Sequence, residues 1–244
     1  MSRYEDVKER LCLALDLPTF AEAESAVDRL REYVGVFKIG MELYTAEGPR
    51  VVEMIHNKGG KVFLDLKFHD IPTTVAKAAA VATRLGVLMF NVHGAGGSTM
   101  MRRCVDAVNE TADKEGLGRP ITLAVTVLTS MNQDELTGEI GVGRDLKDQI
   151  VHLAQLSQKA GLDGVVASPK EIVPIRDACG RHFVLVTPGV RPAWADANDQ
   201  KRVATPKEAM ARGADYIVVG RPILAAEKPD LAARMVLDEM LEVA

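Results

Sequence analysis

The chain contains little cysteine and no long hydrophobic run. Its three cysteines, Cys12, Cys104 and Cys179, are an odd and widely spaced set without a C-x-x-C motif, which argues against a disulfide framework and against a thiolate zinc site. No stretch approaches the ~20 apolar residues of a membrane-spanning helix, and the first apolar run is short and interrupted by Asp16. We therefore expect no export signal, no membrane partner and a cytoplasmic protein.

An excess of either charge is also absent. The 30 Lys and Arg residues against 34 Asp and Glu residues give a net charge of −4, so nothing in the charge balance favours a nucleic-acid partner. No Pro/Ser-rich linker or low-complexity tract divides the chain, and its 47% apolar content is ordinary for a globular protein. We predict one folded domain over residues 1–244, large enough to build its core without disulfides or structural metal.

Short apolar runs alternate with segments of helical spacing along the whole chain. The runs predict eight strands, at 11–16, 34–40, 61–68, 87–93, 121–129, 163–168, 182–189 and 215–220. Helical spacing is clearest between them at 20–33, 46–59, 71–86 and 145–161. Continuously apolar strands are typical of parallel sheets covered by helices. Eight such units in about 250 residues favour an α/β fold of the single (β/α)8 TIM-barrel type over an open doubly wound sheet.

Charged residues stand where several of the predicted strands end, which is where such barrels carry their chemistry. Asp65 and Lys67 are two residues apart on one strand, so both are expected to point into the barrel. Asp16 and Lys38 end neighbouring strands and extend the pair into an alternating array of acids and ammonium groups. Inward charges are costly unless compensated, so the array favours a functional site, and the carboxylates suit Lys67 to donate a proton. A structural ion pair is the alternative.

The last two predicted strands are each followed by an arginine. Arg191 follows the seventh strand, and Gly220 and Arg221 follow the eighth. These two loops frequently form a phosphate site in this fold, and guanidinium forks match phosphate oxygens. The pattern predicts a phosphorylated small-molecule substrate. The alternative is that both arginines are solvent-exposed neighbours of the helix-initiating Pro192 and Pro222.

Two other motifs carry no function in our interpretation. The segment 91–99, NVHGAGGST, lacks the third glycine of a dinucleotide-binding fingerprint, so its glycines indicate a tight turn from strand to helix. His69 and His93 lie near acidic residues, but no H-E-x-x-H or comparable spacing supports a metal site. We therefore predict no bound metal.

Five segments carry a family resemblance. They are LALD with Asp16, FKIGMELY with Lys38, DLKFHDIPTTV from Asp65 to Val75, TPGVRP with Arg191, and VVGRPI with Arg221. Together they resemble the orotidine 5′-monophosphate decarboxylases of the bacterial type. The segments occur in order from the first strand to the eighth, and D-x-K-x-x-D followed by I-P-x-T is highly specific.

The resemblance implies loss of CO2 from orotidine 5′-monophosphate to give UMP, the last step of de novo pyrimidine synthesis, without cofactor or metal. It implies that Lys67 donates the proton and that Asp65, Lys38 and Asp70 complete the charged network. It also implies a homodimer in which Asp70 and Thr74 enter the partner's site. The substrate-binding residues that it implies are Asp16 and Lys38 for the ribose, Asp65, Thr129 and Ser130 near the pyrimidine, and Arg191, Gln200, Gly220 and Arg221 for the phosphate.

Two other classes of protein remain open at this point. One is a metal-dependent aldolase or epimerase acting on a pentulose or hexulose phosphate, since such enzymes share D-x-K-x-x-D and a phosphate loop on the same barrel. The other is a non-catalytic nucleotide-binding barrel, which has no evident need for a lysine flanked by acids. Sensitivity of the activity to EDTA separates the first class from a metal-independent decarboxylase.

Overall fold

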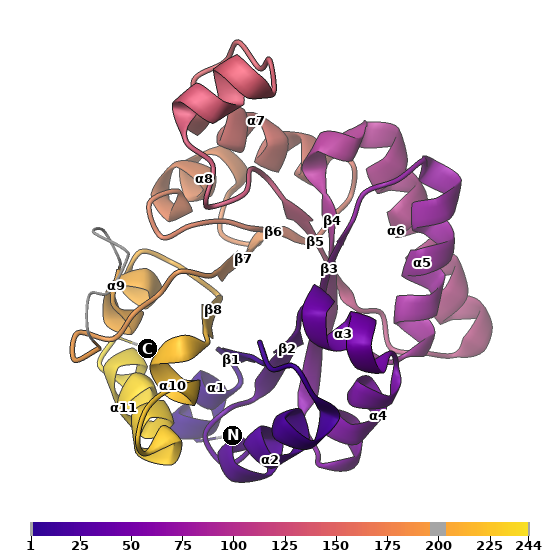
Figure 1. Ribbon diagram of the computed structural model, residues 1–244. Helices are drawn as coiled ribbons and strands as arrows, with labels where there is room; N and C mark the ends of the chain where they lie inside the picture. Colours follow the sequence, from indigo (N-terminus) through magenta and orange to yellow (C-terminus); the bar gives the residue numbers. More distant parts are fainter. Residues whose placement is uncertain (1, 196–203, 244) are drawn as a thin grey trace.

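The computed structural model describes residues 2–195 and 204–243. Eight parallel strands follow one another around a closed barrel in chain order, with the helices outside the ring (Figure 1). The strands are β1 Leu11–Ala14, β2 Val36–Ile39, β3 Lys61–Phe68, β4 Met89–His93, β5 Ile121–Val125, β6 Gly164–Val166, β7 Val184–Thr187 and β8 Tyr216–Val219. The predicted (β/α)8 barrel is confirmed.

The outer layer consists of one helix before β1, helices that connect consecutive strands, and two helices after β8. They are α1 Arg3–Lys8, α2 Phe20–Leu30, α3 Met41–Glu47, α4 Arg50–Asn57, α5 Pro72–Arg84, α6 Gly97–Glu115, α7 Leu146–Lys159, α8 Ile172–Cys179, α9 Pro206–Ala211, α10 Arg221–Leu224 and α11 Pro229–Leu241. Two short turns of other helix types, η1 Gly94–Gly96 and η2 Glu135–Glu139, precede α6 and α7. None of the helices in the described part of the chain is long and apolar enough to cross a membrane.

One predicted helix, at 46–59, differs from the structure. The chain breaks there into α3 and α4, because Gly48 adopts a φ of 64° after Glu47 and Pro49 precedes the first residue of α4. A glycine in this conformation ends a helix, and proline suits the start of the next one. The helical spacing of residues 50–57 was correctly recognised, and the start of the segment was wrong.

The strand side chains alternate between two apolar layers. Positions such as Leu13, Phe37 and Phe90 pack in the cluster shared with the helices. The intervening positions fill the barrel with a second cluster, formed by Cys12, Ala14, Val36, Phe63, Met89, Leu123, Val186 and Val218. Because both faces of each strand are buried, the strands read as continuous apolar runs in the sequence.

Strand β3 is irregular near its carboxyl end. It pairs with β4 through Leu64 and Phe90 and again through Phe68 and Val92, so β3 advances four residues while β4 advances two. Lys67 lies in this bulge with a φ of 53°, the one positive φ outside glycine among the described residues. Residue spacing predicts a regular strand over 61–68, and the bulge departs from that expectation.

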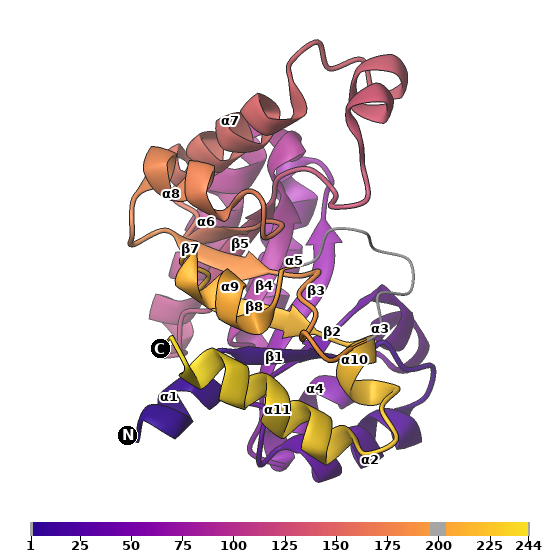
Figure 2. The same cartoon turned by 90° about the vertical axis from the view of Figure 1, so that its left-hand side faces the viewer.

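The two ends of the barrel differ in what they carry. Both chain termini lie at the amino end of the strands, and the segment between β5 and α7 projects on the side toward which β7 and β8 point (Figure 2). The carboxyl rim, where the sequence predicts the site, is therefore on the side of the barrel away from the termini.

Candidate active site

Four charged side chains form a chain of contacts on the carboxyl rim. The Lys38 Nζ lies 3.1 Å from Asp16 Oδ1 and 3.5 Å from Asp65 Oδ2. The other oxygen of Asp65, Oδ1, lies 2.7 Å from Lys67 Nζ. The structure thus joins the residues that follow or end β1, β2 and β3 in the alternating order acid, ammonium, acid, ammonium. We call this set the charged array.

The array is buried at its centre and open at its ends. The exposed fraction of the side chain is 11% for Lys38 and 14% for Asp65, against 26% for Lys67 and 62% for Asp16. Burial by itself lowers the pKa of Lys38, but the charges of Asp65 and Asp16 outweigh it and raise that pKa above its ordinary value. Lys38 is therefore a fixed positive charge, and Lys67 is the more exposed of the two ammonium groups.

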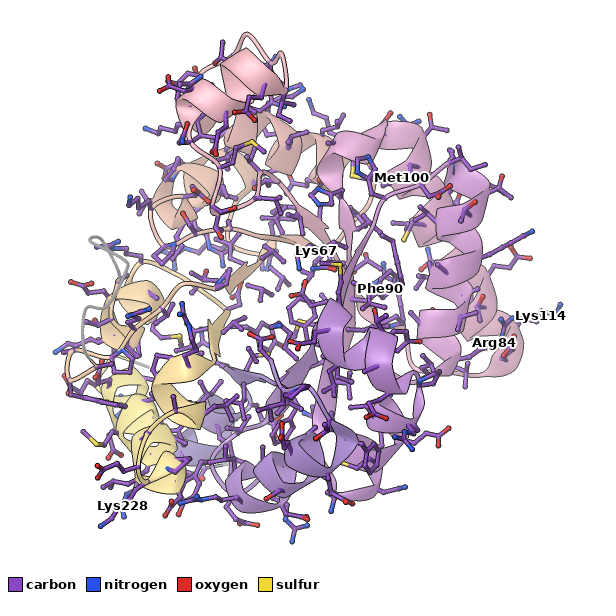
Figure 3. The ribbon with its side chains drawn as sticks, viewed as in Figure 1. Lys67, Arg84, Phe90, Met100, Lys114 and Lys228 are labelled. Atoms are coloured by element: carbon purple, nitrogen blue, oxygen red, sulfur yellow. The ribbon has the colours of Figure 1, made fainter. Side chains whose placement is uncertain are left out.

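A cavity of about 170 Å³ opens beside the array. Its polar wall contains Lys38, Asp65 and Lys67, and Figure 3 shows Lys67 near the middle of the ring of strands. Its other lining residues are mostly apolar: Phe63, Val125, Val127, Leu128, Thr129, Val166, Pro188 and Val218. An apolar pocket with a few convergent polar groups suits a small, largely flat molecule whose reacting atom faces Lys67.

Asn91 on β4 is a residue to which the sequence analysis gave no role. It is fully buried, its Nδ2 donates a hydrogen bond to Asp65 Oδ1 at 2.7 Å, and its Oδ1 accepts one from the Lys67 backbone N–H at 2.8 Å. The sequence could have pointed to Asn91, because it is a polar residue in the apolar run 87–93 and lies two residues after Met89, on the inward face of the strand.

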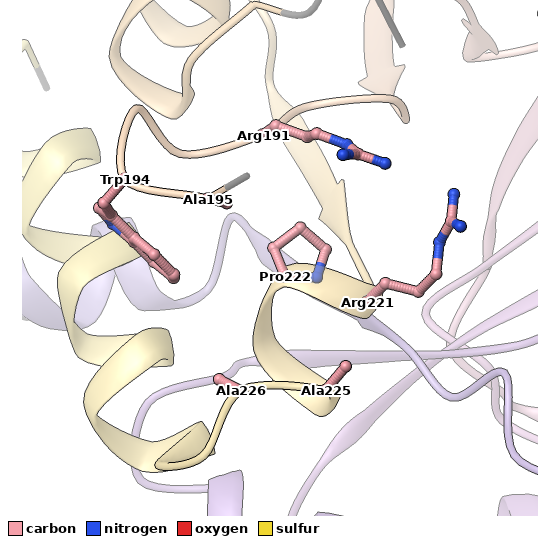
Figure 4. A pocket seen from close by; sticks show the side chains of 7 residues that line it. All are labelled: Arg191, Trp194, Ala195, Arg221, Pro222, Ala225 and Ala226. Carbon is pink, nitrogen blue, oxygen red and sulfur yellow. The ribbon is translucent and has the colours of Figure 1, made fainter. Parts of the chain in front are cut away.

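A second cavity, of about 410 Å³, lies over the loops that follow β7 and β8. Arg191 and Arg221 line it, and their guanidinium groups lie on the same side of the cavity in Figure 4. The other described residues in its lining are Trp194, Ala195, Pro222, Ala225 and Ala226, and none of these is acidic. Two guanidinium forks in this setting fit a phosphate group.

Gly220 and Gln200 are the other two residues predicted to bind the phosphate, and the structure describes only Gly220. Gly220 joins β8 to α10, and a Cβ there would lie 3.2 Å from the Cβ of Ala14, tighter than ordinary contact. Glycine is therefore suited to this close approach between neighbouring strand ends. Gln200 lies outside the described residues.

Two predicted residues lie apart from the charged array. Asp70 and Thr74 are exposed at the start of α5, and the Asp70 Oδ1 accepts the backbone N–H of Ile71 at 2.6 Å. Both residues line a different cavity, of about 350 Å³, which Lys67 and His69 also line. Within one chain, then, Asp70 does not extend the array.

Two further polar pairs flank the site. Thr129 and Ser130 are both exposed in the same turn, and of the two only Thr129 lines the 170 Å³ cavity. The rings of His69 and His93 pack with their centroids 5.2 Å apart. Burial lowers the pKa of His93, and the nearby His69 and Lys67 lower it further. Over residues 2–195 and 204–243, no group of three or more His, Cys, Asp and Glu side chains is arranged to hold a metal ion.

Comparison with known proteins gives a consistent result. The family described as Orotidine 5′-phosphate decarboxylase / HUMPS matches residues 9–236. The chain is 54% identical over 235 residues to the orotidine 5′-phosphate decarboxylase of Syntrophotalea carbinolica, covering 96% of each chain. It is 52% identical over 233 residues to that of Moorella thermoacetica, covering 96% of this chain and 92% of the relative. A crystal structure of orotidine 5′-phosphate decarboxylase from Lactobacillus acidophilus matches with a TM-score of 0.84 at 35% identity, covering 94% of this chain and 98% of that one.

Proposed function

Because the chain belongs to the orotidine 5′-phosphate decarboxylase / HUMPS family, we propose that it converts orotidine 5′-monophosphate to UMP and CO2 in the last step of de novo pyrimidine synthesis. It is then a carboxy-lyase whose whole chain, residues 1–244, forms one catalytic domain. The observation that carries this function is the charged array, which presents the Lys67 ammonium, 2.7 Å from Asp65, to a mostly apolar cavity. A pyrimidine ring fits such a cavity.

The two cavities divide the substrate between them. The 170 Å³ cavity receives the pyrimidine, with Thr129 in its lining and Ser130 next to Thr129 in the chain. The 410 Å³ cavity receives the phosphate, held by Arg191 and Arg221 and by the backbone at Gly220, which precedes Arg221. The ribose lies between them, where Asp16 and Lys38 meet its hydroxyl groups.

The reaction needs stabilisation of negative charge on one ring carbon. The bond between that carbon and the carboxylate breaks, CO2 leaves, and the electron pair stays on the ring carbon. The Lys67 ammonium stabilises the developing charge and then donates its proton to the same carbon. Asp65 raises the energy of the bound substrate by placing a second negative charge beside the departing carboxylate. The array therefore takes the place of an electron-sink cofactor, and we propose that neither cofactor nor metal takes part.

The exposed start of α5 supports a shared site. Asp70 and Thr74 are exposed in the single chain, and Ile71 beside them has 67% of its surface accessible to solvent. We propose that this segment forms the interface of a homodimer and places Asp70 and Thr74 in the partner's active site. We further propose that the enzyme is cytoplasmic, that its substrate is a small nucleotide, and that it has no nucleic-acid or membrane partner.

The test is an ultraviolet assay for loss of orotidine 5′-monophosphate, before and after EDTA treatment, on the wild type and Lys67→Ala. We expect wild-type turnover that EDTA does not reduce. The variant should bind UMP but lose turnover by orders of magnitude, because it lacks the proton donor.

Two results contradict this function, and a third contradicts only the role of Lys67. Activity abolished by EDTA favours a metal-dependent sugar-phosphate enzyme on the same barrel. UMP binding without any turnover favours a nucleotide-binding protein. Near-normal turnover of Lys67→Ala removes that residue from the mechanism.

A further inference from the structure

We propose that Asn91 is a positioning residue that fixes both Asp65 and Lys67 in the geometry that decarboxylation requires. The expected effect of Asn91 on kcat rests on the proposed function. The effect of Asn91 on the conformation of Asp65 and Lys67 does not. Asn91 does not line the cavity beside the array, so it acts through the two residues that do.

The amide of Asn91 makes two hydrogen bonds of opposite sense. Its Nδ2 donates to Asp65 Oδ1 at 2.7 Å, while its Oδ1 accepts the backbone N–H of Lys67 at 2.8 Å. A rotation of the amide by half a turn would set its oxygen against the carboxylate and its NH2 against the N–H. Both contacts would then become repulsive, so the two partners determine one orientation of the side chain.

The position of Asn91 explains why the backbone of Lys67 needs this contact. Phe90 and Val92, its neighbours on β4, pair with Leu64 and Phe68, the residues on either side of the bulge in β3. Asn91 therefore lies opposite the bulge, where the regular strand ladder is interrupted. Its side chain accepts the N–H of Lys67, a residue held at a φ of 53° that L-amino acids rarely adopt. Strained backbone of this kind persists where surrounding contacts fix it.

The hydrogen bond from Asn91 to Asp65 fixes which carboxylate oxygen of Asp65 faces each lysine. Asp65 Oδ1 accepts hydrogen bonds from both Lys67 Nζ and Asn91 Nδ2, at 2.7 Å each. Its Oδ2 faces Lys38 Nζ at 3.5 Å. With Asn91 in place, the carboxylate cannot rotate freely between the two lysines. The Lys67 ammonium thus has its backbone and its counter-ion held by one buried amide.

The test compares Asn91→Ala with a matched control, Thr122→Val. Thr122 on β5 is also fully buried, and its Oγ1 donates to Asp163 Oδ2 at 2.7 Å, but that contact lies at the other end of the barrel strands. We expect Asn91→Ala to lower kcat on the order of 100-fold, as small misplacements of reacting groups do. The KM and the Kd for UMP should change by less than about threefold. Thr122→Val should lose thermal stability and keep kcat within about threefold of the wild type.

A second variant covers the case in which Asn91→Ala does not fold. Asn91→Asp keeps the shape of the side chain and the acceptor for the Lys67 N–H, but it replaces the donor to Asp65 with an oxygen. We expect kcat to fall again with little change in KM. The proposal is overturned if the folded Asn91 variants keep kcat within about threefold of Thr122→Val, or if only KM changes.

A readout without activity separates this inference from the proposed function. Crystal structures of the unliganded wild type and Asn91→Ala should differ in the φ of residue 67 and in the rotation of the Asp65 carboxylate. If the wild type does not decarboxylate orotidine 5′-monophosphate, the proposed function fails, and this comparison still tests Asn91. An unchanged backbone and carboxylate in the variant would show that Asn91 positions neither residue.

Discussion

Charged side chains are used in two different ways on the rim. In the array, each ammonium lies within 3.5 Å of a carboxylate, so the loss of one side chain leaves a partner uncompensated. Among the described residues, the lining of the 410 Å³ cavity includes Arg191 and Arg221 and no acidic side chain. Substitutions in the array should therefore disturb the reacting groups, and substitutions in the cavity should disturb recognition of an anion.

Removal of Arg221 should act through the phosphate. Arg221→Ala is expected to lower kcat/KM. The loss should correspond to about 1.5–3 kcal/mol of transition-state stabilisation, the usual cost of losing a charge-assisted hydrogen bond. The nucleoside orotidine, which has no phosphate, should suffer far less from the change. The measurement is kcat/KM on nucleotide and nucleoside, with Arg102→Ala on the exposed face of α6 as the control. Equal impairment on both substrates would mean that Arg221 acts structurally.

The half-buried His93 predicts loss of stability in mild acid. Burial lowers its pKa below the ordinary value of 6.5, so the unfolded chain binds a proton more readily than the folded one. The free energy of unfolding should therefore fall as the pH decreases through about 6.5. His93→Gln should weaken this dependence without abolishing it, because burial also lowers the pKa of His56.

Urea denaturation of wild type and His93→Gln at pH 7.5 and 5.5 measures that difference. The exposed His152 on α7 provides a control substitution, His152→Gln. The same pH dependence in wild type and His93→Gln would exclude His93 as its source.

The strands could be predicted from sequence more fully than their ends. All eight were found because a strand buried on both faces is a continuous apolar run. Their limits were drawn too wide where apolar residues continue into a loop: β5 ends at Val125, and Val127 lines the cavity beyond it. The bulge in β3 was missed because residue spacing describes a regular strand, whereas the contact made at this irregularity comes from Asn91 on another strand. The meeting of Asp16, Lys38, Asp65 and Lys67 could be predicted, because charged residues stand out at the ends of apolar strands that converge on one rim.

The close contact of β6 and β7 gives a prediction about packing. A Cβ at Gly164 would lie 2.1 Å from the carbonyl oxygen of Val184, and a backbone atom cannot rotate out of the way. Gly164→Ala should therefore lower the free energy of unfolding by about 3 kcal/mol or more. Gly118→Ala is the control, because nothing lies within 4 Å of its added Cβ. Denaturant unfolding of both variants is the measurement, and equal stability would contradict the assigned packing.

The whole molecule presents its chemistry at one end. The array and the arginine cavity follow the carboxyl ends of the strands, while both termini lie at the other end (Figure 2). The exposed start of α5 adjoins the cavity that Lys67 and Asp70 both line. A second copy of the chain bound there would lie next to the array, which is the arrangement that the proposed dimer requires.

Mixed dimers test that arrangement. Lys67→Ala and Asp70→Ala proteins should each be nearly inactive, because every site lacks one of the two residues. In a mixed dimer, one site carries both substitutions and the other has intact Lys67 from one chain and intact Asp70 from its partner. Random equimolar exchange makes about half of the dimers mixed, so activity should recover to about one quarter of wild type under two-fold symmetry.

Subunit exchange by mild denaturation and refolding, verified by mass spectrometry, provides the sample. Wild type taken through the same treatment is the control for losses on refolding. Verified mixed dimers with no more activity than their parents would mean that Asp70 serves the site of its own chain.

Because of the bulge in β3, the geometry of the active site depends on the number of residues between Leu64 and Phe68. Because four residue steps on β3 face two on β4, loss of one residue between Leu64 and Phe68 would turn every later side chain of the strand to the opposite face. Loss of two would restore the facing direction but remove the extra chain that accommodates Lys67. An alignment of related sequences that opens a gap in this stretch would therefore describe a different active site, even where every charged residue is retained.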